Sequence, residues 1–480
     1  MKLSTLLASV PVVRVDGPTD RLVSHVTRDS RDVRPGAVFV AIAGAAFDGH
    51  SAVSGLDHAS AVVVSRPVTV PDGVTVVHVD NGRAAFAALC AAWHGYPGRD
   101  IRVIGVTGTN GKTTTTTLVD EALRAIGRSS GRIGTTGVVL NGAPYPSALT
   151  TPGAEDLQAI LGQARDKGIA SVAMEVSSIG LDQHRVDGVP YHTAVFTNLS
   201  RDHLDYHGTM EAYAASKARL FEQLLRAVGG WPRALLFEGD PSRDAMNAPP
   251  DHWTYGTDRA NLRLESVEAT GHGMTLQVGT PVGTVRIDSA LVGGHNAQNL
   301  VAALGCLLTL DVPADEAAHG LAQVSGVAGR FETVANPGGA LLLVDYAHTP
   351  DALRAALQAV RAVVPGRVLC VFGCGGDRDR GKRPQMGQVA DEGADVVIVT
   401  SDNPRTEAPQ QIVDDILQGV SNPGFVHVDR EQAIAWAVSE ARAGDAVLVA
   451  GKGHETYQDI GGERIDFDDR AALRRAVETA

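Results

Sequence analysis

The chain has 480 residues, 44% of them hydrophobic and 20% charged, which is long enough for about three globular domains. Its net charge of −13 argues against a general nucleic-acid surface, and no apolar run reaches the roughly 18 residues of a membrane span. The four cysteines show neither zinc spacing nor a dense disulfide pattern, which favours a reducing cytoplasm. Residues 1–13 lack a small-residue cleavage site, so a first helix is expected there rather than a signal peptide.

Lysine is scarce in this chain. Only six of the 42 Lys and Arg residues are lysines, and four of them lie in segments rich in Gly, His or acidic residues. These four are Lys112, Lys217, Lys382 and Lys452. Lysine offers a compact ammonium that can also lose its proton, so its retention in such segments indicates a chemical need, although a general bias toward arginine would give the same numbers.

The first section, residues 1–97, has short β-like runs at 37–42, 61–65 and 74–79 joined by Asp/Gly turns. This pattern predicts a small mixed α/β domain. Residues 94–100 contain Gly and Pro and are expected to link it to the second section.

The second section, residues 98–330, alternates apolar strands at 101–106, 171–175 and 193–197 with helical patterns. That alternation predicts a parallel sheet covered by helices on both faces. Strands near 262–267, 274–278 and 284–287 indicate a small antiparallel sheet, followed by a helix over 296–310.

The third section, residues 331–480, has strands at 340–345, 367–372, 395–400 and 446–450, each followed by a loop and a helix. It predicts a Rossmann-like domain. Because ligands of such sheets bind at the carboxyl ends of the strands, the four loops are expected to share one crevice. The fold class is therefore α/β with three domains.

Residues 105–114 (GVTGTNGKTT) follow an apolar strand and precede a helical run. Glycines let backbone N–H groups approach phosphates, Lys112 would reach the β- and γ-phosphates, and Thr113 would ligate Mg²⁺. A strict phosphate-loop pattern has Gly at position 106, where this chain has Val106, so the segment is a variant. Its position between strand and helix argues against a plain glycine-rich turn.

Further polar residues follow the next strands. Glu175 ends a strand two strands from the phosphate loop and could hold Mg²⁺, although a capping role would also explain it. His203 and His207 could bind a metal or be structural. Lys217 lies on a helix among small and apolar residues, where a buried ion pair is the default explanation.

Six segments in chain order resemble the signatures of the Mur ligase family, and the resemblance extends over essentially the whole chain. They are 108–114 (GTNGKTT), 174–178 (MEVSS), 198–208 (NLSRDHLDYHG), 345–350 (DYAHTP), 373–379 (GCGGDRD) and 451–455 (GKGHE). The resemblance implies a monomeric cytoplasmic ligase of peptidoglycan precursor synthesis that uses ATP and Mg²⁺. Its substrates would be a UDP-linked muramoyl dipeptide and meso-diaminopimelate, with no nucleic-acid partner.

The resemblance also implies a mechanism and its residues. ATP would phosphorylate the D-glutamyl carboxylate, and the amine of the amino acid would then attack the acyl phosphate. A carbamylated Lys217 would supply an anionic oxygen for Mg²⁺. The catalytic residues would be Lys112, Lys217, His203, Glu175 and His348, and the metal ligands Thr113, Glu175, His203 and Lys217.

Binding residues are carried over in the same way. Nucleotide contacts would come from Gly108, Thr109, Asn110, Gly111, Lys112, Thr113, Thr114, Asn296, Arg330 and Asp345. The UDP-sugar peptide would contact Arg28, Ser30, Ala45, Ala46, Phe47, Thr150, Thr151, Ser177, Gln183 and Arg185; because the family's loop varies at 45–47, those contacts would be made by the backbone. The amino acid would contact Arg378, Asp402, Asn403, Pro404, Arg405, Gly451 and Glu455.

Three alternatives remain at this point. A lysine-adding ligase would differ at the amino-acid pocket, where Arg405 favours diaminopimelate. A folate polyglutamylating enzyme would leave the first section without a purpose. A guanine-reading nucleotide switch would usually carry an Asn-Lys-x-Asp segment, and the chain contains none.

Overall fold

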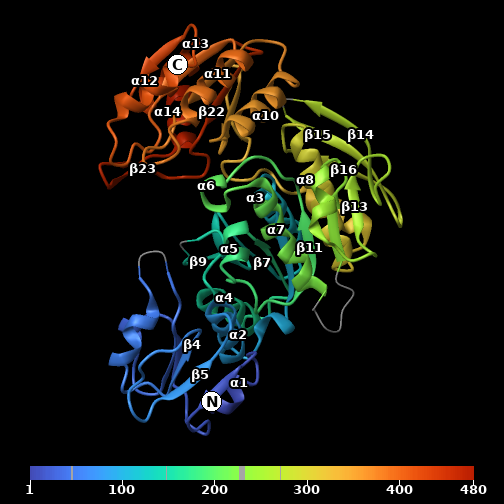
Figure 1. Ribbon diagram of the computed structural model, residues 1–480. Coiled ribbons are helices and arrows are strands. Elements are labelled where there is room, and N and C mark those ends of the chain that lie inside the picture. Colours follow the sequence, from blue (N-terminus) through green and yellow to red (C-terminus); the bar gives the residue numbers. More distant parts are fainter. Residues whose placement is uncertain (45–46, 148, 226–232, 271, 480) are drawn as a thin grey trace.

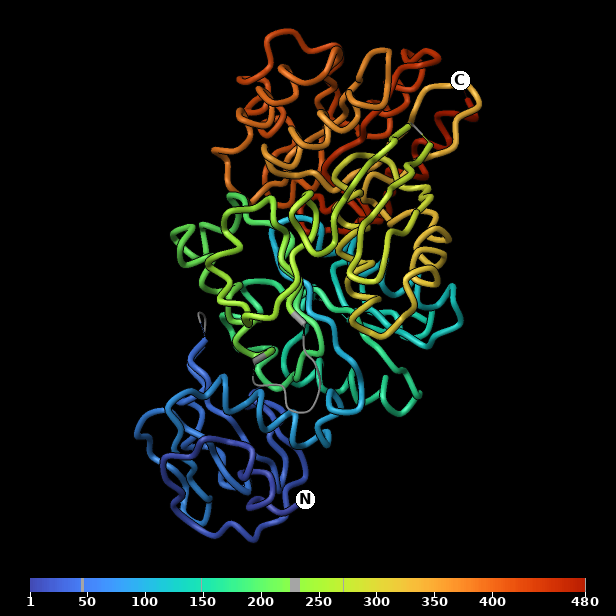
Figure 2. The backbone as a smooth tube through the Cα atoms, turned by 90° about the vertical axis from the view of Figure 1, so that its right-hand side faces the viewer, coloured from blue at the N-terminus to red at the C-terminus, as the bar shows by residue number. Residues whose placement is uncertain are grey.

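The computed structural model describes residues 1–44, 47–147, 149–225, 233–270 and 272–479. Three sheet-based parts follow one another along the molecule (Figure 1), with the N-terminal part at one end and the C-terminal part at the other. The view at right angles shows the same succession (Figure 2). Within the described residues, no helix is long and apolar enough to cross a membrane.

The N-terminal part contains a five-stranded sheet in the order β1-β5-β4-β3-β2, parallel except for β1. Its elements are α1 (Leu3–Leu7), β1 (Arg14–Asp16), β2 (His25–Thr27), β3 (Ala37–Val40), β4 (Ala61–Val64), β5 (Thr75–His78) and α2 (Gly82–Trp93). Helix α2 begins after Asn81, whose side chain accepts hydrogen bonds from two backbone N–H groups and so caps the helix. The expected strands and first helix are present, each shorter than its apolar run.

The central part contains an eleven-stranded sheet in the order β16-β15-β14-β13-β12-β11-β6-β10-β7-β8-β9. Its strands are β6 (Arg102–Thr107), β7 (Ser130–Gly134), β8 (Gly137–Leu140), β9 (Ala143–Tyr145), β10 (Ser171–Glu175), β11 (Tyr191–Phe196), β12 (Arg233–Phe237), β13 (Trp253–Gly256), β14 (Leu262–Thr270), β15 (Gly273–Thr280) and β16 (Gly283–Ser289). Its helices are α3 (Lys112–Ala125), α4 (Ala154–Asp166), α5 (Ser178–Asp182), α6 (Leu204–His207), α7 (Met210–Leu225), α8 (His295–Thr309) and α9 (Ala314–Ala322).

Strand β6 lies near the middle of this sheet, parallel to β10 and β11. Val103 packs in the cluster on the side of α4 and α7, whereas Ile104 packs with α3, α8 and α9. Successive strand side chains point to opposite faces, so a strand covered by helices on both sides becomes a continuous apolar run. That is why the sequence identified it clearly.

The expected small antiparallel sheet is present and extends the main sheet at one edge. β14, β15 and β16 do pair antiparallel, but β14 also pairs parallel with β13, which joins them to the edge of the main sheet. Strand periodicity reports which face of a strand is buried and does not report which edge it joins.

The C-terminal part contains a six-stranded sheet in the order β17-β18-β22-β19-β20-β21, parallel except for β17, and a separate hairpin of β23 and β24. Its strands are β17 (Glu332–Val334), β18 (Leu341–Asp345), β19 (Val368–Phe372), β20 (Val396–Thr400), β21 (Phe425–His427), β22 (Ala446–Ala450), β23 (Tyr457–Ile460) and β24 (Glu463–Asp466). Its helices are α10 (Pro350–Arg361), α11 (Lys382–Gly393), α12 (Pro409–Leu417), α13 (Arg430–Glu440) and α14 (Asp469–Thr479).

A fully buried ion pair joins the last two helices beneath the loops of this sheet. Arg430 donates from Nε to Asp469 Oδ1 at 2.7 Å and from Nη2 to Asp469 Oδ2 at 2.8 Å, and both side chains are 0% exposed. The same guanidinium donates to the carbonyls of Ser401 and Ala450, the residues just before two ligand loops. Arg430 therefore fixes the backbone from which those loops start.

We expect Asp469→Asn to lower the free energy of unfolding of the C-terminal part by about 3–5 kcal/mol, because a buried guanidinium would lose its counter-charge. Urea unfolding followed by a probe in this part measures the change. Glu431→Gln is the matched control, since Glu431 also lies in a first helical turn but pairs with Arg475 at the surface. Its cost should stay below about 1 kcal/mol. Equal effects of the two variants would contradict the assigned role of Arg430.

Candidate active site

The loop of residues 108–111 connects β6 to α3 and is supported by the segment that follows β11. Thr109 N donates to Asn198 O, and Asn110 N donates to Asn198 Oδ1, both at 2.9 Å. Gly108 has φ +147°, and a Cβ there would lie 1.9 Å from Thr197 Oγ1, so only glycine fits. The loop thus presents its backbone at the start of a helix, which is the arrangement that binds phosphate.

Two lysine side chains converge on one backbone oxygen of this loop. Lys112 Nζ and Lys217 Nζ each donate to Gly108 O at 2.8 Å. Lys217 is 1% exposed, and burial together with the Lys112 ammonium holds its pKa well below the usual value. Burial also lowers the pKa of Lys112, while the Glu175 carboxylate acts in the opposite direction. Two like charges at one oxygen create a strong local demand for an anion.

Asp202 lies beside this pair, and its negative charge favours the protonated form of both lysines. The next residue, His203, has φ +53°, and its Nε2 is 3.5 Å from Asp202 Oδ2. The ring of Tyr213 lies 4.3 Å from Lys217 Nζ and 6.0 Å from the His203 ring. His203 and Lys217 are therefore brought together on either side of one tyrosine.

Glu175 is held at the end of β10 by the turn after β7. Its Oε1 accepts from Thr135 N at 2.7 Å, and its Oε2 accepts from Thr135 Oγ1 at 3.0 Å. Thr150 Oγ1 is 3.1 Å from the same Thr135 hydroxyl, and Thr151 Oγ1 donates to Glu175 O at 2.9 Å. Glu175 is 1% exposed, and these hydrogen bonds fix its carboxylate at the carboxyl end of β10.

Arg330 connects the phosphate loop to the C-terminal part. Its Nη2 donates to Thr113 Oγ1 at 3.2 Å, and its guanidinium carbon lies 4.6 Å from the centre of the Tyr346 ring. Within the described residues, its buried Nε has no hydrogen-bond partner. Asp345 accepts from the backbone N–H groups of Phe331 and Ala347, each at 2.9 Å. A donor therefore remains available next to Thr113.

The remaining predicted nucleotide contacts lie around the same loop. Thr114 is buried in the first turn of α3, and a Cβ on Gly111 would lie 2.6 Å from Asn299 Oδ1. Asn299 in turn donates to Asn296 Oδ1 at 2.9 Å, which ties the start of α8 to the loop. His348 Nδ1 donates to Tyr346 O at 2.7 Å in the loop after β18.

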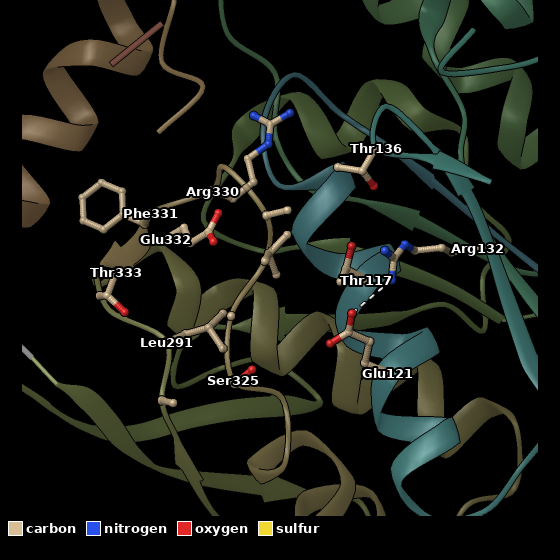
Figure 3. A pocket seen from close by; sticks show the side chains of 14 residues that line it. Thr117, Glu121, Arg132, Thr136, Leu291, Ser325, Arg330, Phe331, Glu332 and Thr333 are labelled. Atoms are coloured by element: carbon tan, nitrogen blue, oxygen red, sulfur yellow. Dashed lines mark hydrogen bonds and ion pairs between the residues drawn. The ribbon is translucent and has the colours of Figure 1, made fainter. Parts of the chain in front are cut away.

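A cavity of about 470 Å³ lies along α3, beyond Arg330 (Figure 3). Thr117 and Glu121 line it from the helix, opposite the segment that carries Ser325 and Arg330. Arg132 lines it from β7 and donates to Glu121 at 3.1 Å. The cavity shares Arg330 with the phosphate loop but contains none of the other predicted site residues.

A second cluster lies where the loops after β20 and β22 meet. Asn403 Nδ2 donates to Glu455 Oε2 at 2.8 Å, and Lys452 Nζ donates to Asn403 Oδ1 at 2.9 Å and to Glu455 Oε2 at 3.1 Å. A Cβ on Gly451, which has φ +116°, would lie 2.5 Å from Asp402 Oδ2. The loops after β20 and β22, two of the four expected to share a crevice, are therefore in contact.

Arg405 and Arg378 border this cluster. Arg405 has φ +51°, and its Nη1 donates to Gly376 O at 2.7 Å. A Cβ on Gly375 would lie 2.9 Å from Arg405 Nη1 and 3.8 Å from Arg378 Cγ, so the two arginines flank one glycine. Pro404 lies between Asn403 and Arg405 and directs the chain outward. The cluster offers cations and a carboxylate side by side.

The predicted nucleotide-sugar residues gather between the N-terminal and central parts. Arg185 donates to Thr151 O at 2.9 Å and to Gln183 Oε1 at 2.7 Å. Burial, and then the nearby charge of Arg28, lowers the pKa of Arg185. Ser177 caps α5 beside them by accepting from Gly180 N. These residues form a cationic patch that leads toward Glu175.

Four predicted contacts of the nucleotide sugar remain. Ser30 starts a short 3₁₀ turn (Ser30–Asp32) in the N-terminal part, and Phe47 is 58% exposed. Ala45 and Ala46 lie outside the described residues.

The proposed metal ligands can be tested for chemical fit. Thr113 and Glu175 supply hard oxygen atoms beside the phosphate loop, and Mg²⁺ commonly takes one or two such ligands, completing its shell with water and phosphate. Within the described part of the chain, no group of three or more His, Cys, Asp or Glu side chains is placed to hold a metal alone. The residues therefore fit a Mg²⁺ ion that arrives with a phosphate substrate.

Four residues of these clusters were not predicted to be site residues from the sequence: Asp202, Thr135, Lys452 and His454. His454 lies in the loop after β22, where burial lowers its pKa to about 4 and the Tyr346 ring is 5.3 Å away. The scarcity of lysine was a signal for Lys452. Thr135 carried no signal, because its role depends on the turn that brings it to Glu175.

Comparisons with known proteins agree with this geometry. Residues 106–307 match the Mur ligase middle domain, and residues 329–453 match the Mur ligase glutamate ligase domain. A UDP-N-acetylmuramoyl-L-alanyl-D-glutamate--2,6-diaminopimelate ligase of Geobacillus thermodenitrificans is 46% identical, over 100% of this chain and 99% of that protein. The protein of that name from Xanthomonas campestris is 44% identical, over 99% and 97%.

Solved structures give the same result. A structure of a UDP-N-acetylmuramoyl-L-alanyl-D-glutamate--2,6-diaminopimelate ligase matches with a TM-score of 0.73 and 34% identity, over 100% of this chain and 99% of that chain. A MurF structure from Acinetobacter baumannii, at 19% identity and a TM-score of 0.64, shares the fold.

Proposed function

Because this chain belongs to the Mur ligase family, we propose that it is an ATP-dependent ligase that adds meso-diaminopimelate to UDP-N-acetylmuramoyl-L-alanyl-D-glutamate. This reaction belongs to peptidoglycan precursor synthesis in the cytoplasm. The observation that carries the proposal is the meeting of Lys112 and Lys217 at Gly108 O. The Lys112 ammonium can screen phosphate charge, and the buried Lys217 amine, whose pKa is lowered, can form the carbamate that would hold Mg²⁺.

The reaction requires two steps. The D-glutamyl carboxylate attacks the γ-phosphorus of ATP, which forms an acyl phosphate and releases ADP. The amine of diaminopimelate then attacks the carbonyl carbon, loses a proton, and the tetrahedral intermediate expels phosphate. Lys112 would hold the β- and γ-phosphates, and its charge would oppose the repulsion between carboxylate and phosphate.

Mg²⁺ would be held by Thr113 and Glu175, with His203 and a carbamylated Lys217 as further ligands, and would neutralise phosphate charge. The depressed pKa of Lys217 supports the carbamate, because only a neutral amine adds to CO₂. Adenine and ribose would be held by Asn296, Arg330 and Asp345, and the unpartnered Nε of Arg330 is a donor available for that contact. His348 would be a catalytic residue.

The three parts of the chain would divide the substrates among them. Residues 1–97 would bind the UDP-sugar through Arg28, Ser30 and the backbone at 45–47. Residues 98–330 would bind ATP and, through Thr150, Thr151, Ser177, Gln183 and Arg185, the sugar–peptide portion. Residues 331–480 would bind diaminopimelate, and the enzyme would act as a monomer.

Arg405, Arg378 and Asn403 would bind the distal carboxylate of diaminopimelate, and Glu455 an ammonium group. Asp402, Pro404 and Gly451 would shape the pocket. A planar guanidinium suits a bidentate carboxylate, and L-lysine has no carboxylate at that end. This is the feature that distinguishes the proposal from a lysine-adding ligase.

We expect ADP release by the purified chain to require the UDP-linked dipeptide and diaminopimelate together, and Lys112→Ala to reduce turnover more than about tenfold. Such a loss corresponds to roughly 1.4 kcal/mol of barrier or more. A coupled ADP assay measures it, with the thermal unfolding midpoint as the control for folding. Turnover above a tenth of wild type in a folded variant would remove Lys112 from the phosphate site.

Lys217→Ala should be nearly inactive, and millimolar acetate or formate should restore part of the rate by replacing the carbamate oxygens. Lys217→Arg should stay inactive, because its guanidinium does not form the carbamate. The same assay with added carboxylate measures both, and Lys112→Ala with the same additive is the control that should not recover. An active Arg variant would show that only a positive charge was needed.

Arg405→Ala should raise the KM for diaminopimelate at least tenfold, since losing one partner of a desolvated charge pair typically costs about 2–5 kcal/mol. The KM values for ATP and the nucleotide sugar should change little. The measurement is kcat/KM for diaminopimelate and for lysine in both proteins. A preference ratio equal to that of wild type would remove Arg405 from the specificity site and leave the lysine-adding alternative open.

A further inference from the structure

Lys452 is a fully buried cation in the amino-acid pocket, at 0% exposure. Its Nζ donates to Asn403 Oδ1 at 2.9 Å and to Glu455 Oε2 at 3.1 Å, and lies 5.6 Å from the centre of the Tyr457 ring. Its ammonium group therefore joins the loop after β20 to the loop after β22. A surface role, the usual one for lysine, is excluded.

The backbone around Lys452 directs it inward. Gly451 and Gly453 both have positive φ, at +116° and +53°, and a Cβ on either would meet another loop within 3 Å: Asp402 Oδ2 at 2.5 Å and Gly329 O at 2.7 Å. This fully buried position suits the compact ammonium of lysine better than the planar guanidinium of arginine. This explains why a chain with few lysines has one at this point.

Lys452 and Asn403 together determine how the Glu455 carboxylate is presented. Oε2 accepts from both Lys452 Nζ and Asn403 Nδ2, whereas Oε1 accepts no hydrogen bond within the described residues. Asn403 Oδ1 accepts from Lys452 and from Asp459 N at 3.0 Å, which fixes the orientation of its amide. Glu455 therefore keeps one oxygen free, and its side chain is 19% exposed.

We propose that Lys452 is a positioning residue for the incoming amino acid, acting through Glu455 and Asn403 rather than by touching the substrate. The proposal rests on the proposed function, because the ligand of Glu455 Oε1 is the ammonium of the amino acid. Without Lys452, Asn403 loses a partner that fixes its amide, and Glu455 Oε2 loses its ion pair. The carboxylate then rotates away from the geometry that the ammonium requires.

The test compares Lys452→Met with wild type in the ADP-release assay. We expect the KM for diaminopimelate to rise at least about tenfold, as for other disrupted buried charge pairs, while kcat at saturation and the KM values for ATP and the nucleotide sugar stay within about threefold. Lys167→Met is the matched control, because Lys167 is exposed on the surface. All its constants should equal those of wild type.

A double-mutant cycle separates positioning from a general structural role. If Lys452 acts through Glu455, then Lys452→Met combined with Glu455→Gln should raise the KM no further than Glu455→Gln alone. Independent effects would multiply instead. Where Lys452→Met lowers the unfolding midpoint too far to be assayed, Lys452→Gln takes its place, since it keeps a donor but removes the charge.

The outcomes are distinct. A raised KM for the amino acid alone, with non-additivity in the cycle, supports the proposal. An unchanged KM, an equal loss for all three substrates, or multiplicative effects would overturn it. If wild type itself releases no ADP with diaminopimelate and the UDP-linked dipeptide, then the proposed function has failed, which is a different result from normal wild-type activity with an unaffected Lys452 variant.

Discussion

Two ammonium groups that share one carbonyl oxygen impose the main constraint on the central part of this molecule. Lys112 and Lys217 both donate to Gly108 O, and Lys217 is buried. Asp202 is the carboxylate whose charge raises the pKa of both lysines. Such a centre is stable only with a further anion or with one amine uncharged. Phosphate binding and lysine carbamylation both meet that requirement.

The sequence predicted the parts of the fold that depend on local pattern. Strand β6 and four of the five parallel strands of the C-terminal sheet are largely buried, so they were visible as apolar runs. The hairpin of β23 and β24 was missed, because β24 is exposed along its length and has no apolar face. The strand that β14 joins was not predicted, since the sequence of a single strand carries no signal for its pairing partner.

The site was predictable to the extent that its residues fall within motifs. Glu175 and Lys217 could be chosen because a charged residue in an apolar or strand-end position is unusual. Thr135 lies in no motif, and nothing in its segment shows that it will face Glu175. Asp202 lies within the 198–208 motif, but its sequence position does not show that it will face the two lysines. Their roles arise because residues far apart in the sequence lie close together in the fold, and only the structure shows which ones do.

The approach of the C-terminal part to the phosphate loop depends on two glycines. A Cβ on Gly329 would lie 2.0 Å from His454 N, and one on Gly453 would lie 2.7 Å from Gly329 O, so the two backbones touch. Through this contact the loop that carries Lys452 and Glu455 lies beside Arg330, which in turn donates to Thr113. In the proposed reaction, an amino acid bound at this loop would therefore lie close to the phosphate loop, as amide formation through an acyl phosphate requires. The contact between the two glycines brings the loops of two separate sheets together.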